Sequence, residues 1–279
     1  MDRRRDKPVD DETFKYFRTF YEYEHTDLRA TLDSVEVGPY WRLENVSFQA
    51  VYNEERMTAH LYFPKNAEPP FQAVVWMGGA ELLRQPGSYD DSSASTIFGF
   101  LLRSGRSVVV PTYYWTMERK PRFRPRPNQQ RVVLPAWSKD IGRTIDYLEL
   151  RPDIDVNKVV FSGASMGASF APIFAAVEPR IKGLVLLSGG TTRRYMPEVD
   201  PWNFTPRVTA PVLMINGRAD FQSLESSQLP LLRAFGTPAN DKKHLLFEGG
   251  HAVPLAYPEI MKAYLDWLDR YLGPVKLRP

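Results

Sequence analysis

The segment KVVFSGASMGASFAPIFAAV, residues 158–177, decides the fold. A short apolar run of strand type leads into Gly163-Ala164-Ser165-Met166-Gly167, and an apolar helical run follows it. A G-x-S-x-G pentapeptide between a strand and a helix raises its serine hydroxyl above the end of the strand. The small glycines permit the tight turn, so this segment predicts Ser165 as a nucleophile. The alternative is a serine that only caps the helix.

The same alternation of strand and helix fills the chain after residue 71. Further apolar runs of strand type lie at 72–77, 107–111, 182–189, 211–217 and 243–250. Helical segments are expected at 92–104, 136–150, 166–178, 224–235 and 257–272. Continuous apolar strands separated by helices predict an α/β fold, with a mostly parallel sheet that helices cover on both faces.

The N-terminal part has a different pattern. Aromatic residues at helical spacing predict a helix over 10–24, and two alternating runs at 42–50 and 57–63 predict a hairpin. We therefore expect an N-terminal helical extension at 1–40 and one catalytic domain at 41–279. Two stretches without periodicity, 113–134 and 190–211, are expected to form lid-like insertions.

A serine hydroxyl needs a base to remove its proton. His251 follows the last predicted strand and the pair Gly249-Gly250, which suits an imidazole that reaches across the sheet edge. Asp220 follows the strand at 211–217 and is the preferred acid, with Asp200 as its rival. The order Ser165, Asp220, His251 is the order expected on such a sheet. The other histidines are interpreted as structural: they are His25, His60 and His244.

Acyl transfer also needs donors for the developing oxyanion. The backbone N–H of Met166, directly after the nucleophile, is one expected donor. The loop after the strand at 72–77 reads Gly78-Gly79-Ala80, and the N–H of Ala80 or of Gly79 is the expected second donor.

Aromatic side chains in the two insertions are candidates for a substrate pocket. On this architecture, insertions at the carboxyl edge of the sheet cover the nucleophile. The expected lining residues are Tyr114, Trp115, Trp202 and Phe204. For each of them, simple packing of the loop onto the body is an equally good interpretation.

Charge is concentrated in one place. The chain of 279 residues has a net charge of +3, but Glu118 to Arg131 alone carries +5, so the rest is slightly acidic. We interpret this stretch as a solvated, proline-stiffened lid that could attract anionic substrates, and we expect no nucleic-acid partner because a single aromatic residue accompanies the cations.

Composition narrows the class of protein further. No apolar run is long enough to span a membrane, and the N-terminus lacks the apolar core of a signal peptide. The chain has no cysteine, which excludes disulfides and fits a reducing compartment, so we expect a cytoplasmic location.

These features together resemble the α/β-hydrolase superfamily over residues 45–273, and within it dienelactone-hydrolase-like and prolyl-oligopeptidase-like esterases. Hydrolase domains that follow bacterial serine/threonine kinase modules resemble the chain more closely. They share stretches like WRLENVSFQAVYNEERMTAHLYFP, DYLELRPDIDVNKV, NFTPRV, LMINGRADF, GTPANDK and WLDRYLGPV. The resemblance implies a serine esterase with Ser165, Asp220 and His251 as its triad. The loop Met77-Gly78-Gly79 departs from the usual H-G-x form because it lacks a histidine.

The expected activity is that of a serine carboxylesterase on small to medium carboxylic esters, with no cofactor and no metal. Two alternatives stay open. One is a small peptidase or amidase of the prolyl-oligopeptidase type, although the chain is too short for the gating domain such enzymes carry. The other is a binding or sensory module on a hydrolase fold. The oligomeric state does not follow from the sequence.

Overall fold

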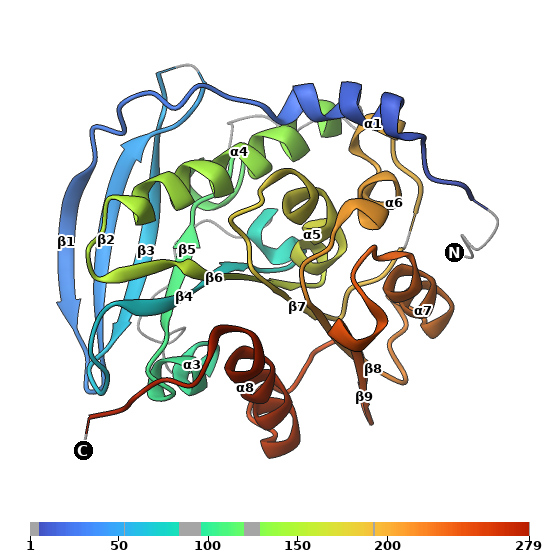
Figure 1. The fold of residues 1–279 in the computed structure, drawn as a ribbon. Helices are drawn as coiled ribbons and strands as arrows, with labels where there is room; N and C mark the ends of the chain where they lie inside the picture. The colour runs from blue at the N-terminus through green and yellow to red at the C-terminus, as the bar shows by residue number, and fades with distance from the viewer. Residues whose placement is uncertain (1–5, 53, 84–95, 120–128, 192, 279) are drawn as a thin grey trace.

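A twisted sheet runs through the middle of the molecule (Figure 1). The computed structural model describes residues 6–52, 54–83, 96–119, 129–191 and 193–278, and within them nine strands form one sheet in the order β1-β2-β3-β5-β4-β6-β7-β8-β9. The strands are β1 (Thr31–Val37), β2 (Trp41–Gln49), β3 (Arg56–Pro64), β4 (Phe71–Met77), β5 (Ser107–Pro111), β6 (Ile154–Ala164), β7 (Leu184–Leu187), β8 (Val212–Gly217) and β9 (Lys242–Phe247).

The sheet has an antiparallel end and a parallel body. Strands β1, β2, β3 and β5 pair antiparallel, and all pairs from β5 to β9 are parallel. The hairpin expected at 42–50 and 57–63 is the β2–β3 pair. The carboxyl ends of β4, β6, β7, β8 and β9 meet at one edge, because parallel strands point the same way. The mostly parallel sheet predicted from the apolar runs is confirmed.

Helices cover both faces of the sheet (Figure 1). They are α1 (Asp11–Arg18), α3 (Gly99–Arg103), α4 (Gln130–Glu149), α5 (Met166–Val177), α6 (Pro201–Phe204), α7 (Glu225–Ala234) and α8 (Pro258–Leu272). Apolar residues of α1, α4, α5, α6 and α7 form the core on one face, and those of α3 and α8 form the core on the other. A parallel sheet buried on both sides needs apolar residues in both directions, as its continuous apolar strands provide.

The N-terminal region differs from the expected helical extension. Its helix ends at Arg18 with a 3-10 turn at Thr19–Tyr21, and Thr31–Val37 forms β1 at the edge of the sheet. A helical extension over 1–40 is therefore wrong for its last part. The physical reason is that the β-branched residues of TLDSVEV suit an extended strand that pairs with β2.

The two expected insertions contain more structure than their composition indicated. The first has a 3-10 turn at Met117–Arg119, and α4 begins at Gln130, six residues before the helix that we expected from 136. The second contains a 3-10 turn at Pro197–Val199, then α6, then another turn at Thr205–Arg207. The Asp200 carboxylate accepts a hydrogen bond from Trp202 N and so caps α6.

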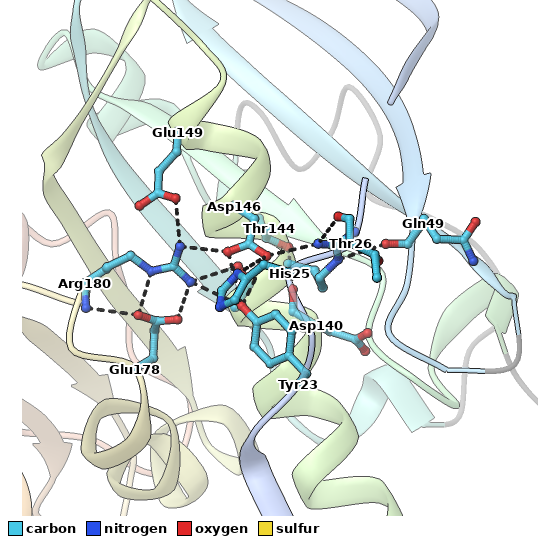
Figure 2. A network of polar contacts seen from close by, with 12 residues as sticks. Tyr23, His25, Thr26, Gln49, Asp140, Thr144, Asp146, Glu149, Glu178 and Arg180 are labelled. Carbon is cyan, nitrogen blue, oxygen red and sulfur yellow. Dashed lines mark hydrogen bonds and ion pairs between the residues drawn. The ribbon is translucent and has the colours of Figure 1, made fainter. Parts of the chain in front are cut away.

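A polar network attaches the N-terminal segment to α4 (Figure 2). The Asp146 carboxylate on α4 accepts from the Tyr23 hydroxyl at 3.2 Å, lies 3.3 Å from His25 Nδ1, and pairs with Arg180 Nη1 at 2.8 Å. Arg143, one turn earlier on α4, donates to Thr26 O at 3.0 Å. These bonds explain why the chain between α1 and β1 follows the length of α4.

Candidate active site

Ser165 occupies a strained turn between β6 and α5. Its backbone has φ 49° and ψ −100°, which a non-glycine residue adopts at a cost and which recurs at functional sites. The turn is held because Ser165 N donates to Leu187 O at 2.7 Å and Gly167 N donates to Gly78 O at 3.1 Å. A Cβ on Gly163 would lie 2.5 Å from the carbonyl carbon of Gly167, so only glycine fits there. The sequence thus specifies this elbow locally.

His251 and Asp220 meet Ser165 at the carboxyl edge of the sheet. His251 Nε2 lies 2.7 Å from Ser165 Oγ, and Nδ1 lies 2.9 and 2.8 Å from the two carboxylate oxygens of Asp220. The Asp220 side chain is fully buried, and Oδ1 also accepts from the backbone N–H groups of Gln222 and Ser223, each at 2.8 Å. With the proton assigned to Nδ1, Nε2 accepts from the serine hydroxyl. The structure thus brings together the three residues expected from the sequence.

The rival acid does not face the histidine. Both carboxylate oxygens of Asp200 accept from nearby backbone, Oδ1 from Trp202 N at 3.0 Å and Oδ2 from Tyr195 N at 3.2 Å. This is the helix cap described above, so Asp200 is structural.

The other histidines have polar neighbours away from Ser165, as their structural interpretation requires. His25 lies against Asp146, His60 Nδ1 lies 2.6 Å from Asn45 Oδ1, and His244 Nε2 lies 3.1 Å from Asn216 Oδ1. Burial lowers the pKa of His60 and of His244 below the usual value.

The loop after β4 lies beside the nucleophile. A Cβ built on Gly79 would lie 3.2 Å from Ser165 Cβ and 2.6 Å from Glu81 Oε2. The two expected donors in this loop differ, because Gly79 N already donates to Glu81 Oε1 at 2.6 Å. The N–H of Ala80, which begins a 3-10 turn at Ala80–Leu83, therefore stays the candidate second donor beside that of Met166. Sequence reasoning did not single out Glu81, although it follows Gly79 by two residues.

Two of the four expected pocket residues are buried. Phe204 is fully buried, and its ring packs edge-on against Phe14 and Tyr21 at centroid distances of 5.4 and 5.2 Å. Trp202 is also buried, and its indole donates to Asp6 O at 3.1 Å. Phe204 is therefore part of the core and does not line a pocket. Trp202 also lines a small pocket with Ser169 and Tyr195, so its place in a substrate pocket stays a prediction.

Tyr114 and Trp115 remain candidates for the pocket. Both are half-buried, and their rings stack at 5.1 Å. Trp115 has a positive φ of 59°, which is costly for a bulky residue. Burial raises the pKa of Tyr114 above its usual value, with Glu55 acting in the same direction. Their role in substrate binding stays a prediction.

The basic stretch divides into parts with different environments. Arg119 is not a solvated cation: its buried guanidinium donates to Asp140 Oδ2 at 3.0 Å, to Thr112 O at 2.5 Å and to Glu55 Oε1 at 3.1 Å. Arg131 pairs with Glu198. The cations expected to face anionic substrates, Arg122, Arg124 and Arg126, lie outside the described residues.

Neither a metal site nor a membrane-spanning helix occurs in the described ranges. There, no group of three or more His, Asp or Glu side chains is arranged to hold a metal ion. In the same part of the chain, no helix is both long and apolar enough to cross a bilayer.

The comparisons with known proteins agree with this geometry. The model of the FSH1 serine hydrolase family matches residues 159–263, which include all three residues of the trio. The hydrolyase poxO of Penicillium oxalicum is 24% identical over 173 residues, which cover 58% of this chain and 35% of that protein. The chain thus spans about a third of the length of the curated relatives it matches.

Solved structures show the same architecture at low identity. Acetyl xylan esterase 1 from Thermoanaerobacterium sp. JW/SL YS485 superposes with a TM-score of 0.73 at 14% identity, covering 95% of both chains. Glucuronoyl esterase from Solibacter usitatus gives 0.67 at 15% identity, covering 94% of this chain and 93% of that one. The resemblance to kinase-linked domains stays a prediction. Sheet topology, strained serine turn and structural matches together show that the chain has the α/β-hydrolase fold.

Proposed function

We propose that the protein is a serine hydrolase that cleaves small to medium carboxylic esters through an acyl-enzyme on Ser165. One observation carries the proposal: His251 Nε2 lies 2.7 Å from Ser165 Oγ while Nδ1 faces both oxygens of the buried Asp220 carboxylate. A base within hydrogen-bond distance of a serine hydroxyl, itself oriented by a carboxylate, is the arrangement that activates the hydroxyl.

The reaction follows from the positions of these atoms. His251 Nε2 takes the proton of Ser165 as Oγ attacks the ester carbonyl carbon, and the carbonyl oxygen becomes an oxyanion near the N–H groups of Met166 and Ala80. The tetrahedral intermediate collapses, the bond to the alcohol oxygen breaks, and the imidazolium protonates the leaving alcohol. His251 then removes a proton from water, which attacks the acyl-enzyme and releases the acid. Asp220 orients the ring and stabilises the imidazolium throughout.

Esters are favoured over amides and over pure ligand binding. The similar folds above include an acetyl xylan esterase and a glucuronoyl esterase, both named as ester-cleaving proteins. The strained turn at Ser165 also supports catalysis, because a binding module has no use for a costly backbone that exposes a hydroxyl to a base.

A panel of p-nitrophenyl esters of increasing acyl length tests the proposal, with aminoacyl anilides as the amide series. Ser165→Ala should abolish turnover, whereas Ser169→Ala, one helical turn along α5, should retain it. A fluorophosphonate probe should label the wild-type chain on Ser165, as peptide mass spectrometry would show. Ester turnover that persists in Ser165→Ala would refute the mechanism, and cleavage of anilides without cleavage of esters would replace the esterase by an amidase.

A further inference from the structure

Ser188 lies at the centre of the bonds that hold the three residues of the site together. It follows the last residue of β7, is 2% exposed, and has a positive φ of 54° although it is not glycine. Its N–H still donates to Ile215 O at 2.9 Å, as if β7 continued along β8. The chain therefore turns sharply at Ser188 after its last ladder bond. A buried polar residue held in an unfavourable backbone conformation suggests a role that offsets the strain.

The side chain of Ser188 holds the histidine. Its hydroxyl donates to the backbone carbonyl oxygen of His251. His251 lies in the loop between β9 and α8, outside any strand or helix, and its ring is positioned by that loop. The Ser188 hydroxyl therefore attaches the loop to the end of β7, directly beside Leu187, whose carbonyl accepts from Ser165 N. The nucleophile Ser165 is thus hydrogen-bonded to Leu187, and the base His251 to its neighbour Ser188.

The backbone of Ser188 holds the acid through a second serine. Ser223, also 2% exposed, donates from its hydroxyl to Ser188 O at 3.0 Å, and its N–H donates to Asp220 Oδ1 at 2.8 Å. Gln228 on α7 in turn donates to Ser223 O. One continuous set of buried hydrogen bonds therefore connects Ser188 to Asp220.

We propose that Ser188 is a positioning residue which, with Ser223, fixes the His251 ring between Asp220 and Ser165. It touches no substrate; it acts through the backbone of the histidine and the carboxylate of the acid. Small displacements matter in such a site, because misplacing a catalytic group by about 1 Å costs about a hundredfold in rate. The proposal rests on the proposed hydrolase function, and it assigns a role that neither the triad nor the oxyanion donors include.

Ser188→Ala tests the hydroxyl, and Ser188→Gly tests it without backbone strain, since glycine adopts a positive φ freely. The matched control is Ser162→Ala. Ser162 is a fully buried serine on β6 whose hydroxyl also donates to a backbone carbonyl, that of Val185 at 3.3 Å. On a neutral p-nitrophenyl ester, both Ser188 variants should lose about tenfold to a hundredfold in kcat with KM within about twofold. Ser162→Ala should keep kcat while its melting temperature falls by about as much as that of the Ser188 variants.

A second measurement does not need turnover. The proton between His251 Nδ1 and Asp220 should give a downfield proton NMR signal, identified by its loss in His251→Ala. It should be sharp in the wild type and in Ser162→Ala, and broadened by exchange in Ser188→Ala and Ser188→Gly. An unchanged signal together with an unchanged kcat in the Ser188 variants would overturn the proposal. If no ester is hydrolysed at all, the proposed function fails, but the NMR comparison still decides the role of Ser188.

Discussion

Asp220→Asn is the substitution whose effect the structure defines most sharply. In the wild type, Oδ1 of Asp220 accepts from two backbone N–H groups as well as lying near the imidazole, whereas Oδ2 faces only His251 Nδ1 among the described contacts. In asparagine the amide oxygen must take the position of Oδ1, because an NH₂ group there would face two donors. The NH₂ group is then directed at His251 Nδ1, which has to accept.

The consequence is a wrong tautomer. A proton moved to Nε2 faces the Ser165 hydroxyl, so the ring cannot remove the serine proton. In a serine protease with a Ser-His-Asp triad, the same aspartate-to-asparagine substitution lowers kcat by about 10⁴, equivalent to about 5 kcal/mol of barrier. We expect the same order of loss here, with the fold retained because the two backbone bonds survive.

Steady-state hydrolysis of a short p-nitrophenyl ester measures the effect, and circular dichroism confirms folding. Asp200→Asn is the matched control. Asparagine keeps the cap on Trp202 N, but its NH₂ group would face the N–H of Tyr195, so this variant should keep kcat while losing about 1 kcal/mol of stability. An Asp220→Asn enzyme with more than a tenth of wild-type kcat, or an equal loss in Asp200→Asn, would refute the assignment of the acid.

Three further outcomes are expected. Glu81→Gln keeps an acceptor for the N–H of Gly79 but removes a negative charge within about 6 Å of Ser165 Cβ. The kcat/KM for a choline ester, divided by that for its uncharged 3,3-dimethylbutyl analogue, should therefore fall about fivefold. An unchanged ratio would contradict this. Arg119→Met leaves the buried Asp140 carboxylate without its cation and should lower the free energy of unfolding in urea by about 3–5 kcal/mol, whereas a loss below about 1 kcal/mol would mean the pair is dispensable. Phe204→Ala should cost about 3–5 kcal/mol in the same assay while kcat stays near wild type; a large loss of kcat at full stability would restore its place in the pocket.

The parts of the fold that the sequence predicts are those decided locally. The apolar runs of β4, β5, β7 and β8 and the second half of β6 are buried on both faces, which makes them recognisable. The turn at Ser165 is indicated by its own glycines. His251 and Asp220 could be selected because each follows a strand, and the ends of parallel strands converge. Nothing about distant parts of the chain is needed for these inferences.

The errors concern residues whose environment is supplied by distant segments. Phe204 is an aromatic residue in an irregular stretch, and it becomes core only because Phe14 and Tyr21 pack on it. Arg119 belongs to a basic run, yet Asp140 on α4 and Glu55, in the turn before β3, remove it from solvent. Composition treats all cations of that run alike, whereas their pKa, burial and partners depend on the tertiary structure.

The difference between local and distant determinants also explains why the roles of Ser188 and Ser223 could not be predicted from the sequence. The nucleophile, base and acid are reactive residue types, and their positions at strand ends can be read from the chain. Ser188 and Ser223 are ordinary serines, and their bonds reach His251 and Ser188 across 63 and 35 residues. Their significance arises only when the sheet brings β7, β8 and β9 into order. Because residues that act through others leave no pattern of their own in a single sequence, the strained φ of Ser188 is the observation that distinguishes it from the other buried serines.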